Sequence, residues 1–346
     1  MREYQLFFKD CLSLNSMAKA NTVCLAFSIE RDILEGATSS FTVNEIPKNV
    51  NEGDVLGLVD PYGTIVYEGV VTSIEADGQS VQASQIESLF NDNWLYRVPE
   101  QTTIENALLD VIQNDFQQTS DTIMTSKYGV FTVTAETQTS GVFVSEEQVI
   151  NFESFLYSIF NNFGVRLYIH IPFEAGTPTI TIARREYTPL KVGNNARIIT
   201  SITPTTEVQQ TNKLVIYSQE NEYRATYYRT EDGATTNPSA PTRLPVVNTE
   251  FVFSDDEIST IINQYFSEAM YNHYIEYEML LNNKLYDFYN MELGQPLAIW
   301  VNLDYYDSIY TGYSMSKEER GGIGTVIIKC GKVRSKLTSK IMEMFQ

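Results

Sequence analysis

The 346-residue sequence has few of the side chains that metal sites and hydrolytic active sites use. It contains three cysteines, Cys11, Cys24 and Cys330, and two histidines, His170 and His273. The cysteines are far apart and form no CxxC pair, which argues against a disulfide framework or a structural zinc site. No HExxH, GxSxG or paired cysteine and histidine signature occurs, so peptidase and serine-hydrolase functions lack their usual support. We therefore expect a protein that is not an enzyme and that holds no metal or cofactor.

Long apolar runs and positive charges are also scarce. No segment approaches the roughly 18 consecutive apolar residues of a membrane span, and the N-terminal stretch lacks the apolar core of a signal peptide. These absences favour a soluble chain made in the cytoplasm. The 24 lysines and arginines stand against 44 aspartates and glutamates, a net charge of −20. Such a charge argues against a surface that grips nucleic-acid phosphates, because that affinity comes mainly from basic contacts.

Aromatic residues are abundant instead, with 22 tyrosines and 18 phenylalanines. Tyrosine combines a wide apolar ring with a polar tip, and aromatic residues favour strands. Much of the chain also alternates between apolar and polar positions, with turn signals at short intervals. The sequence therefore predicts a β-rich protein with large buried interfaces.

One sequence pattern occurs twice. Residues 53–75 and 294–318 each open on glycine, run through an alternating apolar segment, pass a turn and resume in a Tyr-x-Gly strand. The tyrosine follows the first glycine by 14 residues in the first copy and by 16 in the second, so we expect the second turn to be two residues longer. This pattern predicts a duplicated β-hairpin module. The matched positions are Gly53, Leu56, Tyr67 and Gly69 in the first copy and Gly294, Leu297, Tyr310 and Gly312 in the second.

The order of the expected elements divides the chain into two similar β-modules with an α+β domain between them. Residues 1–97, and residues 191–235 together with 291–338, alternate as strands and are expected to form two antiparallel β-barrels. Residues 98–190 combine helix-capping signals and helical periodicity with a strand hairpin. Residues 236–290 are expected to be a loop and a helical insertion in the second barrel. The predicted fold class is thus α+β and β-rich.

A tyrosine-rich segment within this insertion is the candidate interface. Residues 255–290 have apolar positions at helical spacing and six tyrosines among acidic and amide residues. Two interpretations stay open. Either the helix packs on its own barrel, or it presents tyrosines to another subunit or a partner protein, because tyrosine is enriched at interfaces. The candidate interface residues are Tyr265, Tyr271, Tyr274 and Tyr277.

The whole order of elements resembles the tail hub family of bacteriophages, which includes baseplate hub proteins and the N-terminal hub modules of siphophage tail-associated proteins. In the middle domain, FLYSIFNNFGVRLYIHI is similar to the helix, glycine and strand of that family. The resemblance covers nearly the full length of the chain. The resemblance also rests on the strand LGQPLAIWV, the Tyr310-x-Gly312 strand, and Gly331-x-Val333-Arg334 followed by Leu337-Thr338.

The resemblance implies a structural virion protein at the tail tip or baseplate, assembled in the host cytoplasm. Members of the family form homotrimers, and two barrels per chain then give six like positions, which match a six-fold distal tail or tail tube ring. The opposite face would hold a tail tip, spike or fibre protein. DNA would pass through the lumen without specific binding, and the hub would close or gate this channel until ejection. An acidic lumen would repel the DNA backbone.

Other functions stay open from the residues alone. Aromatic-rich β-domains are common in carbohydrate-binding adhesin modules, although Trp94 and Trp300 are the only tryptophans and both lie within strand patterns. A cell-wall hydrolase that uses two carboxylates is a less favoured alternative, because carboxylates are so numerous that no pair stands out. The hub of a phage-derived contractile injection device would have the same physical properties as a tail hub, so the sequence does not distinguish the two.

Overall fold

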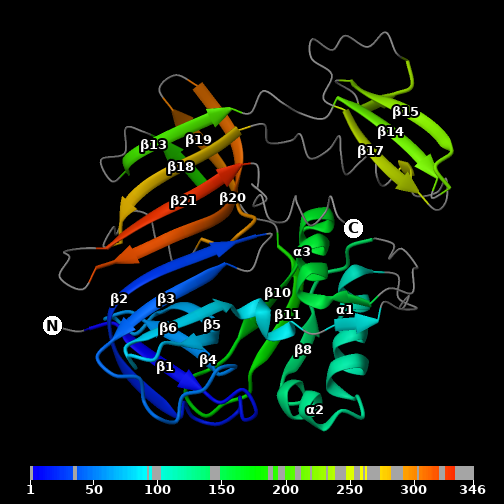
Figure 1. The fold of residues 1–346 in the computed structure, drawn as a ribbon. Helices are drawn as coiled ribbons and strands as arrows, with labels where there is room; N and C mark the ends of the chain where they lie inside the picture. The colour runs from blue at the N-terminus through cyan, green and yellow to red at the C-terminus, as the bar shows by residue number, and fades with distance from the viewer. Residues whose placement is uncertain are drawn as a thin grey trace.

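Figure 1 shows the fold of the chain in a computed structural model. The elements fall into two β-modules, a middle domain and a small separate sheet. None of the helices in the described part of the chain is long and apolar enough to cross a membrane. The structure describes residues 3–33, 37–91, 93–95, 103–140, 149–185, 190–193, 199–206, 212–218, 220–230, 233–237, 247–252, 258–259, 262, 273–281, 291–301, 304–318 and 324–331.

Six antiparallel strands close into a barrel in the first module. Strand β1 pairs with β4 on one side and with β2 on the other, so the lateral order β1-β4-β5-β6-β3-β2 returns to its start. Every second side chain points inward, as a barrel requires; in β6, for example, Val81 and Ala83 are fully buried. The strands are β1 (Gln5–Lys9), β2 (Ala20–Asp32), β3 (Thr38–Val43), β4 (Val55–Val59), β5 (Ile65–Ile74) and β6 (Ser80–Gln85).

The second module repeats this lateral order. Its strands run β12-β19-β20-β21-β18-β13, so β13, β18, β19, β20 and β21 are the counterparts of β2, β3, β4, β5 and β6. It differs at β12, which pairs with β19 in parallel, whereas β1 pairs with β4 antiparallel. Within the described ranges β12 does not pair with β13, so the closure of the first barrel is not repeated there. The strands are β12 (Leu190–Gly193), β13 (Ile199–Thr206), β18 (His273–Leu280), β19 (Pro296–Val301), β20 (Asp304–Lys317) and β21 (Thr325–Gly331).

The two copies of the repeated hairpin begin in the same way. Gly53 and Gly294 have φ values of +88° and +87°, in the left-handed region that glycine tolerates. Each of their N–H groups donates to a carbonyl oxygen at 2.8 Å, Gly53 to Val71 and Gly294 to Tyr310. The predicted duplication is therefore confirmed in the backbone.

The second half of the hairpin has a different register from the one that the sequence match predicts. Tyr67 and Tyr306 occupy the same place in the pairing with β4 and β19. A β-bulge follows Val71 in the first copy and Tyr310 in the second. Tyr310 therefore corresponds to Val71, and the second turn is two residues shorter instead of longer. Matching identical letters gave the wrong alignment here, because pairing and bulges set the register of a strand.

The middle domain combines helices with a three-stranded sheet, as predicted. The sheet has the order β10-β11-β8, with β10 and β11 antiparallel. Helix α3 ends at Gly164, as its sequence predicts; φ is +68° there, and its N–H donates to the Phe160 carbonyl at 2.8 Å. The elements are η1 (Ile86–Phe90), β7 (Asn93–Leu95), α1 (Ile104–Val111), η2 (Ile112–Gln117), α2 (Thr122–Tyr128), β8 (Thr132–Ala135), β9 (Val149–Asn151), α3 (Phe152–Phe163), β10 (Val165–His170) and β11 (Thr179–Arg184).

The insertion in the second module carries a sheet of its own. The sequence predicts residues 191–235 as strands of the second barrel, but β14, β15 and β16 pair with β17 in the order β16-β15-β14-β17. Figure 1 shows this sheet apart from both modules. Alternation reveals that a strand is half buried, but it does not reveal which strand it pairs with. The strands are β14 (Lys213–Ser218), β15 (Tyr223–Thr230), β16 (Gly233–Thr235) and β17 (Val247–Val252).

The helix predicted for residues 255–290 is wrong for its central part. Residues 273–280 form strand β18, in which every second side chain is buried, Tyr277 among them. A period of two fits only a strand, whereas the helical spacing comes from the residues before it. The candidate interface residues Tyr265 and Tyr271 lie outside the described residues.

Candidate functional site at the junction of the two modules

The two modules join edge to edge through β2 and β20. Six residue pairs run antiparallel, from Phe27 opposite Lys317 to Asp32 opposite Gly312, so the modules share one continuous sheet. Their buried apolar side chains also form a single core. Because β20 is the counterpart of β5, the junction joins two unlike edges, one of the β2 type and one of the β5 type.

Each chain has one further edge of each type. Strand β13, the counterpart of β2, pairs with β18 alone in the part of the chain that the structure describes. The last residues of β5 correspond to the part of β20 at the junction; they pair with β6 on one side and face no described strand on the other. Thr72 and Glu75 at this edge are exposed. Strand β5 ends at Ile74 and the chain turns back between Glu75 and Ser80, so this edge is shorter than the edge of β20, which reaches Lys317.

Gly312 allows the strands of the junction to meet. A Cβ atom at this position would lie 2.5 Å from the carbonyl oxygen of Arg31, a distance that real Cβ atoms do not reach. Beside this contact, the Ser314 hydroxyl lies 3.4 Å from a carboxylate oxygen of Glu30. Lys329 Nζ lies 3.8 Å from the same oxygen. The junction is thus a close backbone contact with polar side chains at its margin.

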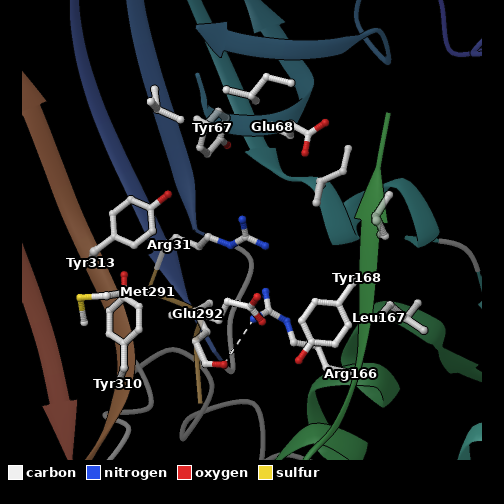
Figure 2. Close-up of a pocket in the computed structure, with 15 residues that line it drawn as sticks. Arg31, Tyr67, Glu68, Arg166, Leu167, Tyr168, Met291, Glu292, Tyr310 and Tyr313 are labelled. Carbon is white, nitrogen blue, oxygen red and sulfur yellow. Dashed lines mark hydrogen bonds between the residues drawn. The ribbon is translucent and has the colours of Figure 1, made fainter. Parts of the chain in front are cut away.

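A buried ion cluster connects the middle domain to this junction. Glu87 Oε1, in η1, accepts from Arg31 Nη2 at 2.7 Å and from Arg166 Nη2 at 3.2 Å. Arg31 lies at the end of β2 beside β20, whereas Arg166 comes from β10 and also donates to the Leu293 carbonyl at 3.5 Å. Figure 2 shows the side chains of Arg31 and Arg166 approaching each other. One carboxylate therefore links the first module to the middle domain at the edge of the second.

Burial and charge act in opposite directions on this cluster. Burial disfavours the ionised carboxylate of Glu87, but Arg31 and Arg166 together hold its pKa below the usual value. Burial likewise opposes the charge of Arg31, yet Glu87 raises the pKa of the guanidinium. Glu87 and Arg31 are therefore both ionised at neutral pH, and each charge compensates the other inside the protein.

A cavity of about 230 Å³ lies beside the ion cluster. Figure 2 shows Tyr67 and Glu68 of β5 on one side of it and Tyr310 and Tyr313 of β20 on another. Burial raises the pKa of Glu68 to about 7, although the N–H of Ile171 donates to its carboxylate at 3.3 Å. Glu68 therefore gains or loses a proton near neutral pH.

The middle domain also contacts both modules through aromatic rings that lie on glycines. The Phe173 ring covers Gly57 of β4, where a Cβ atom would lie 2.1 Å from the ring. The Phe160 ring of α3 covers Gly294, where a Cβ atom would lie 2.6 Å from the ring. Only glycine leaves room for these contacts, so the middle domain lies directly on the backbone of both modules.

The chemistry of the junction is ion pairing and proton uptake. Arg31 and Arg166 share the carboxylate of Glu87, and a second acidic side chain, Glu68, titrates near neutral pH. Among the residues that the structure describes, no group of three or more histidine, cysteine, aspartate or glutamate side chains could hold a metal ion.

Four of the repeat positions lie in the core that the modules share. Leu56, Leu297, Tyr67 and Tyr310 are all buried. The Tyr67 hydroxyl donates to the Ser84 carbonyl at 3.1 Å, which satisfies its polar tip inside the barrel. These residues belong to the core of the modules, and Tyr67 and Tyr310 also line the cavity beside the ion cluster.

The remaining predicted residues lie in different surroundings. A Cβ atom on Gly69 would lie 2.4 Å from a backbone carbonyl oxygen inside the first barrel, whereas Gly312 lies at the junction. The sequence match equates these two glycines, but their roles differ. Of the candidate interface tyrosines, Tyr277 is buried in the core, and Tyr274 donates to the carboxylate of the residue two positions on at 2.6 Å. The structure thus places both on a strand of the second module.

Sequence analysis missed the ion cluster of Arg31, Glu87 and Arg166. The only signal is a charged residue inside a strand pattern, in IERDI and in VRLYIHI. Arg31 and Arg166 lie 56 and 79 positions from Glu87 along the chain, so no local pattern links the three.

Comparison with known proteins finds similarity in structure but not in sequence. No family model matches the chain, and no curated protein is similar to it. The 43 kDa tail protein of prophage MuSo2 from Shewanella oneidensis is 12% identical, with 96% of this chain and 98% of that one covered and a TM-score of 0.61. The tail protein from Neisseria meningitidis MC58 is 10% identical, with 95% and 96% covered and a TM-score of 0.59.

A third structure of similar fold is prophage tail protein gp18 from Listeria monocytogenes EGD-e. It is 11% identical, with 99% of this chain and 98% of that one covered and a TM-score of 0.53. The likeness extends over nearly the whole length of each protein. This chain therefore has the fold of phage tail proteins, which is the fold that the sequence resemblance predicts.

Proposed function

We propose that this chain is a structural protein of a virion, the trimeric hub at the distal end of a phage tail tube. Three chains would form a ring of six modules. One face of the ring would join a six-fold ring of the distal tail or tube, and the other would hold the tip, spike or fibre protein. DNA would pass through the lumen, which the hub would close or gate until ejection. The solved structures from Shewanella oneidensis, Neisseria meningitidis and Listeria monocytogenes named above are tail proteins, which supports a place in the tail.

The observation that carries this proposal is the unlike pair of edges at the junction. An interface between two different edges is heterologous, so repeating it builds a ring when the rotation closes. Within one chain the contact is already made once, between β2 and β20. The remaining β13 edge of one chain would meet the β5 edge of the next, and three chains would close the ring of six that a six-fold tail requires.

A disulfide trap tests this contact. Glu30 lies opposite Ser314 within the chain, and their counterparts are Thr205 in β13 and Glu75 after β5. The Glu30 N–H points to β3 and donates to the Ser39 hydroxyl, so it makes no hydrogen bond to β20. Glu30 and Ser314 are therefore a non-hydrogen-bonded pair of antiparallel strands, with Cα atoms about 4.5 Å apart, a distance that suits a disulfide. We expect the double variant Thr205→Cys with Glu75→Cys to give covalent trimers on oxidation.

The matched control is the double variant Glu30→Cys with Ser314→Cys. Its disulfide forms inside one chain, so it stays a monomer on a denaturing gel. The mass of the wild-type protein in solution is measured alongside, and a trimer is expected. A wild-type monomer, together with a Thr205→Cys and Glu75→Cys variant that forms no cross-links, contradicts the proposal. If that monomer also binds cell-wall glycans, the chain is an adhesin module. If it releases products from cell walls, the chain is a hydrolase.

A further inference from the structure

The two arginines of the ion cluster have donor groups that the described part of the chain does not satisfy. The Nε–H of Arg31 is buried and has no hydrogen-bond partner among the described residues. Nη1 of Arg166 reaches only as far as the Leu293 carbonyl, at 3.5 Å, which is a long distance for a hydrogen bond. A buried donor without an acceptor costs free energy, so these groups favour an acceptor that comes from solution.

Both arginines line the cavity of about 230 Å³ beside the ion cluster. Figure 2 shows Arg31 and Arg166 reaching toward the same space, with Glu68 on its other side. Tyr168 also lines the cavity and is only half-buried, so small ions can enter from solvent. The cavity is large enough for several water molecules or for a small polyatomic ion. Glu87 is not among the residues that line it, so the unpaired Oε2 of Glu87 does not face such an ion.

The charges around the cavity do not balance while Glu68 is protonated. Glu87 compensates one of the two arginines that it contacts, and Glu292 is paired with Arg185. One positive charge then has no carboxylate of its own. Burial raises the pKa of Glu68 to about 7, so the surroundings of the cavity are net positive below this pH. Above it, the ionised Glu68 supplies the missing negative charge.

Neutral hydroxyl groups from the second module complete the lining. Burial raises the pKa of Tyr310 and that of Tyr313, so both side chains keep their protons and can donate hydrogen bonds. The titratable and charged groups that surround the cavity with Glu68, or pair with a group that does, are Arg31 of β2, Tyr67 of β5, Glu87 of η1, Arg166 and Tyr168 of β10, Arg185, Glu292, and Tyr310 and Tyr313 of β20.

We propose that this cavity binds a small oxyanion, a carboxylate or dihydrogen phosphate ion, between Arg31, Arg166 and Glu68. Guanidinium groups match the geometry of carboxylate and phosphate oxygens, and a protonated carboxyl group adds one more donor. Arg31 belongs to the first module, Arg166 to the middle domain and Tyr313 to the second module. The bound ion therefore links three parts of the chain. The site lies within one chain, so it does not depend on the proposed trimer.

Binding of the ion depends on pH because the ion and an ionised Glu68 compete for the same positive charge. The ion binds the form of the protein in which Glu68 is protonated. With a pKa of about 7, this form makes up about 90% of the protein at about pH 6 and about 10% at about pH 8. The dissociation constant should therefore be up to about tenfold higher at the higher pH.

Acetate and sulfate are suitable probes, because neither changes its charge between about pH 6 and about pH 8. Each replaces chloride at constant ionic strength, and the dissociation constant follows from the rise of the melting temperature with anion concentration. We expect both anions to stabilise the wild type more than chloride does at about pH 6, and less strongly at about pH 8. Arg166→Gln should weaken their binding at least about tenfold, because it removes charged donors.

Glu68→Gln tests the site by a second route. Its amide is neutral and can donate, so this variant should bind the two anions at about pH 8 as tightly as the wild type does at about pH 6. Arg224→Gln is the matched control for Arg166→Gln, because it makes the same change at an exposed position of β15 and should bind like the wild type. If Arg166→Gln does not fold, the comparison of Glu68→Gln with the wild type decides alone.

Two results would overturn the inference. Acetate and sulfate that stabilise the wild type no more than chloride would show that the cavity does not select an oxyanion. Binding with the same pH dependence in Glu68→Gln as in the wild type would show that the ion lies elsewhere on the protein.

Discussion

At the scale of single residues, Gly312 decides how closely the modules approach each other. Gly312→Val would place a Cβ atom 2.5 Å from the Arg31 carbonyl oxygen. Both strands are held on their other sides, by β3 and by β21, so neither can move away without losing further pairs. We expect the free energy of unfolding, measured by urea titration, to fall by about 2 kcal/mol or more, as in overpacked cores.

Ser314→Ala is the control for the Gly312 variant. It removes a hydroxyl group 3.4 Å from Glu30 at the same junction and adds no atom. The free energy of unfolding should change by less than about 0.5 kcal/mol. A Gly312→Val protein as stable as this control would show that the two strands are not in close contact.

Glu68 should make the stability of the protein depend on pH. Its folded pKa of about 7 lies above the roughly 4.3 of an unfolded glutamate. Between these values the folded state holds a proton that the unfolded state has lost, so this contribution to stability is complete at low pH and disappears as pH rises through 7. The wild type should lose about 1–2 kcal/mol between about pH 5 and pH 8 through this group, allowing for its partial exposure.

Glu68→Gln isolates that contribution. The amide keeps an acceptor for the Ile171 N–H but does not titrate. The melting temperature of the variant relative to the wild type should therefore be higher at pH 8 than at pH 5. Glu52→Gln, at an exposed position, should show no such difference between the two pH values. Equal behaviour of the two variants would mean that Glu68 is solvated in the folded protein.

At the scale of elements, the Glu87 cluster should contribute far more than an exposed ion pair. Glu87→Gln leaves Arg31 and Arg166, which are only 20% and 14% exposed, without a countercharge, and breaking a largely buried pair costs about 3 kcal/mol. The pair of Arg185 and Glu292 is shorter, at 2.6 Å, but its side chains are 39% and 33% exposed. Glu292→Gln should therefore cost only about 0–1 kcal/mol.

Urea unfolding of both variants, followed by circular dichroism, provides the comparison. The charge change is the same in each, so a difference between them reports burial alone. Proteolysis adds a second readout, because loss of the Glu87 cluster should expose the connections between the first module and the middle domain to cleavage before global unfolding. Equal stability of the two variants would show that Glu87 is not the link between these elements.

The elements could be predicted from the sequence where local patterns dominate. The alternation in VRLYIHI and the glycine that ends α3 are local signals, and the structure confirms both. Strand β18 was missed because its period of two follows directly on a stretch of helical spacing in the same tyrosine-rich segment. Tertiary pairing with β13 and β21 selects the strand there, and no local rule contains that information.

The junction could be predicted only in outline. The repeat correctly predicted two similar modules, because each module has its own local pattern of strands and turns in the sequence. The repeat could not predict that Gly312 lies against Arg31, since 281 positions separate the two residues. The letter match pairs Tyr67 with Tyr310, whereas the strand pairing matches it with Tyr306, four residues earlier; a shift by an even number keeps the alternation of apolar residues, which is why identical letters gave a false match.

At the scale of the whole molecule, the chain divides into parts that occur twice and parts that occur once. The two modules repeat the same strand order, whereas the middle domain and the β14 to β17 sheet have no second copy in the described part of the chain. In the proposed trimer the repeated parts would make six like positions and the single parts three. One chain can in this way connect a six-fold structure to a three-fold one.

The net charge of the whole molecule leads to the last prediction. Each chain carries −20, and affinity for DNA arises when cationic side chains release counterions from the phosphates. We expect the purified assembly to leave the fluorescence anisotropy of a labelled duplex of about 30 base pairs unchanged, at about 50 mM and about 200 mM salt alike. DNA could then slide through the lumen without being held by it. Binding that weakens steeply between these salt concentrations would reveal a basic surface that contacts phosphates, and an acidic, non-binding channel would then have to be abandoned.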